Sequence, residues 1–386
     1  MKFDKVPELN LHLKRMTPNQ AKILIKYGIK QHWDIKDFYQ ISEELEEYII
    51  LHSPPEPDYS ELIYLQAKLL FFSGNLLKLN DIYALTAASR NVLGVQIYYA
   101  LGLAFQGHSK QGLDILNQID SEMFMNDSFV KVEFLNIKLF IYSIKRNHLK
   151  VADYYSQIIA YCDSHIESAE LKAHVLPWAY LRQAYTIRSR GKVVEALDLI
   201  TKCQRDLNVF PHRFFQVMVF TLLGHCHHNL GNIDEALKFY DQAIDLALET
   251  HARILLSILY NRVGMAMAGQ KQPQLAKKYY QKAVTQARKA GAEWLQIGPL
   301  ANLAYWKISI GAVKEAIDDF HQFIEIAASV GDERELCYAQ LTLAELYRGI
   351  GDVAKTKYFL SKGFDLAVKL GLFRFVSHPE DNVDYN

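Results

Sequence analysis

The chain has 386 residues, half of them hydrophobic, which is enough apolar material for a sizeable core and too much for a disordered polymer. Its 43 Lys and Arg residues balance its 43 Asp and Glu residues. No overall charge therefore draws it to nucleic acid or to an anionic membrane, and these numbers exclude binding through net charge.

The cysteines and the hydropathy of the chain bear on its compartment. The four cysteines form no CxxC pair, which argues against a structural zinc site or a compact disulfide framework, so we expect reduced thiols. The opening stretch MKFDKVPELNLHLKRM is interrupted by charges, unlike a secretory signal. No run of about 18 apolar residues suits a membrane span. We therefore expect a cytoplasmic protein without membrane contact.

The first residues predict a small helical cap over 1–58. Thr17 followed by Pro18 is a favourable helix start, and Asp34 opens a second helix that runs to about Leu51. The segment His52–Ser60, HSPPEPDYS, then carries three prolines that cannot continue a helix. We expect a domain boundary there.

Residues 59–168 predict degenerate helical hairpins. One hairpin contains Ala67, Leu70 and Gly74 and continues into a helix from about Leu77 to Ala88. Two further hairpins follow at offsets like those of the clearer repeats downstream. Their marker residues are Ala100, Gly107 and Leu116, and then Asn147, Ala152 and Ile159.

The chain beyond Leu171 repeats with a period of 40 residues, and such a period indicates a solenoid. Small residues recur where two helices need to approach closely. They are Ala184, Gly224, Gly264, Ala304 and Ala344, each 40 after the last.

Seven residues after each small residue comes a turn position, where glycine adopts the left-handed conformation that ends a helix. Four of the five positions are glycine, and the turn series is Gly191, Gly231, Lys271, Gly311 and Gly351. A second helix follows each turn. Its markers are Ala196, Ala236, Ala276, Ala316 and Thr356, followed four residues later by Ile200, Tyr240, Tyr280, Phe320 and Leu360.

The segment Leu223–Ala243, LGHCHHNLGNIDEALKFYDQA, has the small, turn and aromatic positions of a tetratricopeptide repeat. Residues from about Leu171 to Gly371 resemble that family. The resemblance implies an all-α fold, a right-handed superhelical solenoid of antiparallel helix hairpins, with five repeats in 169–373. The period exceeds the usual 34 or so residues, which resembles the long-repeat subgroup of kinesin light chains and several bacterial sensors.

The C-terminal residues predict a polar tail over 374–386, which contains HPEDNVDYN. A repeat array needs its last apolar face covered. We expect Leu372, Phe373 and Phe375 to fold back over the final hairpin.

The sequence has no Gly-rich phosphate loop, GxSxG elbow, HExxH helix or calcium loop, and we expect neither enzymatic activity nor a cofactor. The cluster His225, Cys226, His227 and His228 contains possible zinc ligands. Successive helical positions point in different directions, and only His225 and His228 share a face, so we expect no metal site. We expect Cys226 and His227 to face the interior and the other two histidines to face the groove.

In the family, residues on the first helix of each hairpin line the concave groove. Carried over by position, the partner-binding set mixes aromatic, amide and cationic side chains, which suits an extended peptide. It comprises Trp178, Tyr185, Arg188, His225, His228, Asn229, Asn261, Arg262, Met265, Asn302, Tyr305, Glu345 and Arg348. The alternative is that Tyr185, Met265 and Tyr305 only pack between hairpins.

The Lys and Asn pair with which some family members clamp a C-terminal carboxylate is absent, since the matching positions are Leu181 with Tyr185, or Thr221 with His225. The basic stretch Lys145–Lys150, KRNHLK, lies between paired helices, where a solvated turn explains it, and we expect no nucleic acid partner. Our first hypothesis is a scaffold or adaptor that binds a protein or peptide segment. The alternative is a bacterial-type signalling regulator that senses a peptide or small ligand. A homodimer is possible.

Overall fold

A computed structural model of the chain describes residues 17–18, 21–22, 35–54, 58–72, 75–86, 93–119, 128–209, 213–249 and 252–372. Within these ranges the backbone forms helices and turns and contains no strand, which confirms the all-α prediction. The helices are α3 (Ile35–His52), α4 (Asp58–Phe72), α5 (Leu76–Thr86), α6 (Leu93–Gln106), α7 (Ser109–Asn117), α8 (Ser128–Ile144), α9 (His148–His165), α10 (Ala169–Arg188), α11 (Val193–Val209), α12 (Arg213–Asn229), α13 (Ile233–Glu249), α14 (Arg253–Gly269), α15 (Pro273–Ala290), the 3-10 helix η2 (Glu293–Gln296), α16 (Ile297–Ser309), α17 (Val313–Ser329), α18 (Glu333–Gly349) and α19 (Val353–Lys369).

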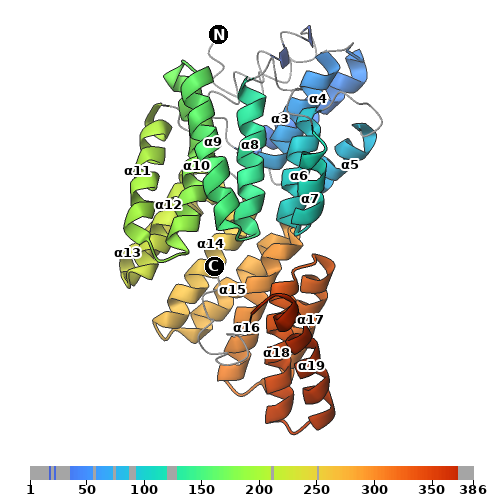
Figure 1. The fold of residues 1–386 in the computed structure, drawn as a ribbon, viewed down its shortest axis with the longest axis vertical. Helices are drawn as coiled ribbons and strands as arrows, with labels where there is room; N and C mark the ends of the chain where they lie inside the picture. Colours follow the sequence, from blue (N-terminus) through green and yellow to red (C-terminus); the bar gives the residue numbers. More distant parts are fainter. Residues whose placement is uncertain are drawn as a thin grey trace. The chain divides into compact units, whose positions relative to one another are not determined.

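The chain, whose helices are labelled in Figure 1, forms two compact units, and the division falls within α14 and near the end of α6. Unit 1 comprises Met1–Ala104 and Ser109–Leu256, and unit 2 comprises Phe105–His108 and Ser257–Asn386. The division of the sequence at residues 58, 168 and 373 stays a prediction.

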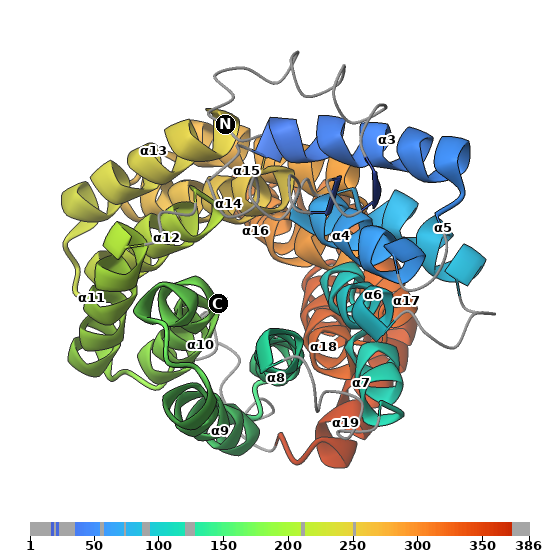
Figure 2. The ribbon, with the colours of Figure 1, turned by 90° about the horizontal axis from the view of Figure 1, so that it is seen from above.

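In unit 1 consecutive helices pair as antiparallel hairpins. Helix α8 packs on α9, α10 on α11, and α12 on α13, and neighbouring hairpins join through α9 with α10 and α11 with α12. Figure 2 shows α8, α10 and α12 on the inside of a curve and α9, α11 and α13 on its outside. Each apolar face is thus buried against the next hairpin, as in a solenoid.

The two helices of a hairpin approach closely at the small residue of the repeat. A Cβ atom at Gly224 would lie 2.4 Å from Cε1 of Tyr240, and one at Gly264 would lie 2.5 Å from Cε1 of Tyr280. Both tyrosines are buried. Because each ring occupies the space that a side chain on the first helix would take, the small and aromatic positions recur together.

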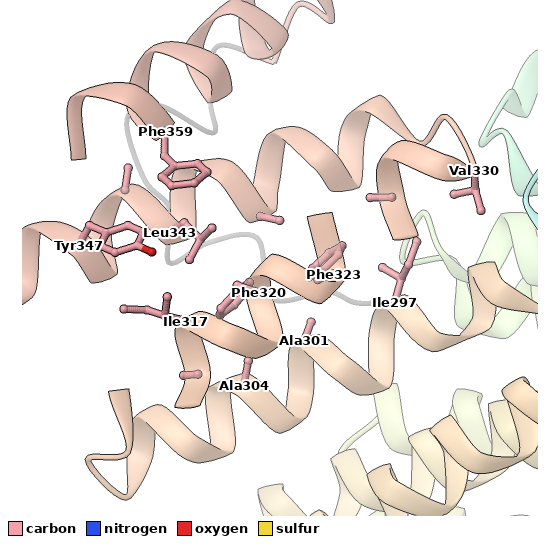
Figure 3. Packing of buried hydrophobic residues seen from close by; sticks show 14 residues of the cluster. Ile297, Ala301, Ala304, Ile317, Phe320, Phe323, Val330, Leu343, Tyr347 and Phe359 are labelled. Carbon is pink, nitrogen blue, oxygen red and sulfur yellow. The ribbon is translucent and has the colours of Figure 1, made fainter. Parts of the chain in front are cut away.

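In unit 2 the same packing builds the core shown in Figure 3. Ala301 and Ala304 of α16 lie against α17, whose rings at Phe320 and Phe323 stack with their centres 6.0 Å apart. Leu343 of α18 belongs to the same cluster. The figure also shows that helices α16, α17 and α18 contribute to one continuous core.

The last hairpin departs from the sequence pattern. Leu360 was expected at the packing position, but it is 48% exposed, and Phe359 is buried at 8%. The Phe359 ring stacks on Tyr347, with centres 5.6 Å apart. The prediction for Leu360 is therefore wrong, because the larger neighbouring ring fills the space beside α18.

The turns adopt the predicted left-handed conformation. Gly191, Gly231, Gly311 and Gly351 have φ between 78° and 80°, and Lys271, at the same position, has φ 59°. A second series that the sequence analysis did not use lies after the second helices. Its members are Gly291, Gly331 and Gly371, with φ from 65° to 68°.

The bounds of the upstream helices α3 and α4 agree with the predicted break at the proline-rich segment. Helix α3 ends at His52 and α4 begins at Asp58, so the proline-rich segment separates two helices. The Asn147 side chain accepts a hydrogen bond from the Lys150 amide and caps α9, which explains the turn at KRNHLK.

Some predictions concern residues outside the described ranges. Most of the cap over 1–58 before α3, the fold-back of Phe373 and Phe375 and the tail over 374–386 lie there. Across the part of the chain that the structure describes, no helix combines the length and the apolar character needed to cross a membrane.

Replacement of Gly224 by leucine should destabilise unit 1 by about 1–3 kcal/mol, because the new side chain collides with the Tyr240 ring. Urea unfolding followed by circular dichroism measures the change. The control is Gly269→Leu, since a Cβ atom at this helical glycine meets no atom within 4 Å. Equal stability of Gly224→Leu and the wild type would contradict the packing described above.

Lys271→Gly should stabilise the protein by about 1 kcal/mol, because glycine adopts positive φ without the steric cost that a lysine carries. Thermal unfolding reports the shift. Lys278→Gly is the matched control at an exposed position within α15. There glycine lowers the helix propensity and increases the entropy of the unfolded chain, so the substitution should destabilise the protein. A loss of stability in Lys271→Gly would mean that its side chain makes compensating contacts.

Candidate functional site

Seven aromatic side chains from helices α4, α6, α8, α10 and α12 of unit 1 meet, and we call them the inner aromatic cluster. Trp178 of α10 lies 5.3 Å from Phe215 and 6.0 Å from Phe214, both of α12, and 5.9 Å from Phe140 of α8, measured between ring centres. The members are Phe71, Phe72, Tyr98, Phe140, Trp178, Phe214 and Phe215.

Helix α4 reaches this cluster from far upstream in the sequence. The Phe72 ring lies 5.4 Å from that of Phe214, and the Phe71 ring lies 6.4 Å from that of Trp178. Trp178, predicted as a groove residue, is therefore half-buried among rings from α4, α8 and α12, and its contact with a partner stays a prediction.

A buried ion pair accompanies the cluster between α4 and α8. The Lys68 ammonium binds the Glu133 carboxylate, which also accepts hydrogen bonds from the hydroxyls of Tyr64 and of Tyr98, the latter at 3.0 Å. Burial and the nearby carboxylate raise the pKa of Tyr98. Because each charge has its counter-charge and hydrogen bonds, this network fixes the two helices together.

The predicted residues at the end of α10 and on α12 form a connected group. Arg188 donates from Nη1 to Oδ1 of Asn229 at 3.3 Å, and its guanidinium lies 5.1 Å from the centre of the Tyr185 ring. Tyr185 is in turn 6.4 Å from the His225 ring. The structure therefore brings together four predicted residues of two consecutive hairpins.

Two members of this group are less open than expected. Arg188 is 3% exposed and His225 is 4% exposed. The expectation that His225 faces an open groove is wrong, because the rings of Tyr185 and Tyr240 enclose it. His228 is half-buried and Asn229 is exposed.

The HCHH segment separates its side chains in space. Cys226 is buried, and His227 is half-buried and stacks on Phe239 with ring centres 5.2 Å apart. Burial raises the pKa of the Cys226 thiol to about 11. No group of three His, Cys, Asp or Glu side chains suited to a metal ion occurs among the residues described.

In unit 2 an amide pair links α14 and α16. Asn302 donates from Nδ2 to Oδ1 of Asn261 at 2.9 Å, and both side chains are half-buried. The Arg188–Asn229 pair in unit 1 also spans 41 residues but lies at another position of the repeat, so polar side chains bridge consecutive first helices in both units.

The other predicted residues of unit 2 divide into packed and exposed ones. Arg262 donates from Nη1 to the Met265 sulfur at 3.6 Å. Tyr305 packs its ring 5.7 Å from that of Phe320, and its hydroxyl contacts that of Tyr338. Glu345 and Arg348 form an exposed ion pair with each other on α18.

The sequence analysis missed polar residues on α8 and α10. Asn136 on α8 donates a hydrogen bond to the Val175 carbonyl of α10, and Arg182 on α10 lies over the ring of Phe140, a member of the inner aromatic cluster. The spacing of Arg182, four residues after Trp178, places both on one helical face and could have revealed it. The contribution of α8 lacked such a signal, because the repeat pattern is degenerate there.

The comparisons with known proteins agree with this architecture. The sequence model of the tetratricopeptide repeat family matches residues 215–289, which span α12, α13, α14 and most of α15. The chain contains tetratricopeptide repeats. No curated protein matches the sequence.

Two solved structures of tetratricopeptide-type solenoids show the same fold. A Rap protein complexed with competence and sporulation factor is 11% identical, with 92% of this chain and 99% of that chain covered and a TM-score of 0.64. The APC/C hetero-tetramer Cut9–Hcn1 is 16% identical, with 84% of this chain and 56% of that chain covered and a TM-score of 0.55. At these identities the likeness concerns the fold alone.

Proposed function

We propose that this tetratricopeptide-repeat chain is a non-enzymatic scaffold or adaptor that binds a protein or peptide segment along the first helices of its hairpins. The observation that supports this most is the polar bridge between consecutive first helices, Arg188 with Asn229 and Asn261 with Asn302. A bound backbone can take over such hydrogen bonds, because amides both donate and accept. The flanking rings supply apolar contact for its side chains.

The absence of a catalytic role is part of the proposal. Tetratricopeptide-repeat scaffolds are generally non-catalytic, and their function comes from stacked hairpins that present one extended surface. The proposed occupant is a protein or peptide segment rather than nucleic acid, since the chain carries equal numbers of basic and acidic residues. We propose a cytoplasmic location.

A sensor is the second candidate function. The Rap protein with the same fold was crystallised with competence and sporulation factor, and its likeness extends over nearly the whole of both chains. In this version, a peptide or small ligand shifts the chain between two arrangements of its hairpins. A homodimer is compatible with either function.

The double variant Arg262→Ala/Asn302→Ala should lose its partner without unfolding, because half-exposed polar side chains contribute little to stability. Affinity capture from the lysate of the native host, read by mass spectrometry, compares it with the wild type. The matched control is Arg205→Ala/Asn208→Ala, which removes the same two residue types from exposed positions on α11.

The proposal expects a protein or peptide that the wild type and the control retain and the Arg262→Ala/Asn302→Ala variant does not. A co-purified peptide or metabolite, in place of a protein, would favour the sensor. Equal retention by all three proteins would contradict a binding site on these first helices.

A further inference from the structure

Arg182 of α10 lies beside the inner aromatic cluster of unit 1. It follows Trp178 by four residues on α10, so both side chains project from one helical face. Its guanidinium carbon lies 4.0 Å from the centre of the Phe140 ring of α8. The residue is half-buried, so part of it remains exposed to solvent.

This guanidinium has no counter-charge among the residues that the structure describes. It forms no ion pair, and its buried Nε–H has no hydrogen-bond acceptor. Burial lowers its pKa to about 9. A desolvated charge without a partner destabilises the ligand-free protein. Binding of an anion to Arg182 would offset this desolvation free energy.

Two other buried cationic side chains of unit 1 have hydrogen-bond acceptors on neighbouring side chains. The Lys68 ammonium, which is buried on α4, is neutralised by Glu133 and surrounded by tyrosine hydroxyls. Arg188, six residues after Arg182 on α10, donates to Asn229. Arg182 has only the face of an aromatic ring, which attracts the cation but accepts none of its in-plane N–H groups.

A second unsatisfied polar group lies one turn before Phe140 on α8. Asn136, which is 2% exposed, donates from Nδ2 to the Val175 carbonyl of α10 at 3.0 Å. Its Oδ1 atom is buried without a donor. Asn136 and Arg182, on two consecutive first helices, thus each have a polar atom that lacks a hydrogen-bond partner among the described residues, and of the two only Arg182 is partly exposed.

We propose that Arg182 is the anchor for a carboxylate of the bound segment, either its C-terminal carboxylate or an Asp or Glu side chain. This inference rests on the proposed peptide-binding function and names the chemistry of the ligand. A planar guanidinium matches a carboxylate with two parallel hydrogen bonds, and the pair is strong where water is partly excluded. The Lys and Asn clamp known in the family has no part in it, since Leu181 and Tyr185 occupy those positions.

The test uses a library of random-sequence hexapeptides in four matched forms. One fixed position is Glu or Gln, and the C-terminus is a free acid or an amide. The full-length wild type is compared with Arg182→Gln, with Arg182→Lys, and with the control Arg205→Gln, an exposed arginine on α11. Circular dichroism confirms that each variant is folded, and the measured quantity is the ratio of acid to amide peptides retained.

The wild type and the Arg205→Gln control should retain acid forms about tenfold over their amide counterparts, as expected for one charge-assisted hydrogen-bonded pair. Arg182→Gln should lose this ratio, and Arg182→Lys should keep part of it. Preference for the Glu forms would identify a side-chain carboxylate as the ligand group, and preference for the free C-terminus would identify the terminal one.

Two outcomes separate the two proposals. If the wild type binds peptides without preferring acids, or if Arg182→Gln keeps the preference, the anchor is wrong and the peptide-binding function stands. If the wild type retains no peptide of any form, the peptide-binding function fails and the anchor fails with it. If Arg182→Gln does not fold, the ratio of acid to amide peptides retained by Arg182→Lys decides. A ratio as high as the tenfold value of the wild type would contradict a bidentate contact with the arginine.

Discussion

The fold depends on the close approach of two helices within each hairpin. A glycine or alanine on the first helix leaves space, and a ring from the second helix fills it, as Tyr240 does beside Gly224 and Tyr280 beside Gly264. Because this contact recurs at the same repeat position in two consecutive hairpins, it constrains the angle between their helices and therefore how the next hairpin stacks. The inward placement of the first helices, and with it the candidate binding surface, follows from that stacking.

Most of the fold could be predicted from the sequence, because the small and aromatic residues that contact each other within a hairpin recur at the same positions of successive repeats. The 40-residue spacing of small residues, turn glycines and rings was enough to locate the hairpins, and even Lys271 occupies the left-handed position of the series. The prediction that Leu360 packs within the terminal hairpin was wrong, since no following repeat constrains which residue of α19 is buried.

The candidate site was less predictable, because burial there depends on segments distant in sequence. The position of Trp178 is determined by Phe71 from α4 as well as by its own repeat, and no periodicity relates these residues. The enclosure of His225 and the isolation of Arg182 depend likewise on rings from neighbouring helices. Buried charges in this chain differ by whether a partner is built in, as for Lys68, or missing, as for Arg182.

The central claim is that a bound segment lies along the first helices of the hairpins. Amide hydrogen exchange of the full-length chain, with and without the captured partner, tests it most directly. The account predicts that binding slows exchange in first helices, either α10 and α12 of unit 1 or α14 and α16 of unit 2, and leaves exchange in the second helices α11, α13 and α15 unchanged. Protection confined to those second helices would contradict it.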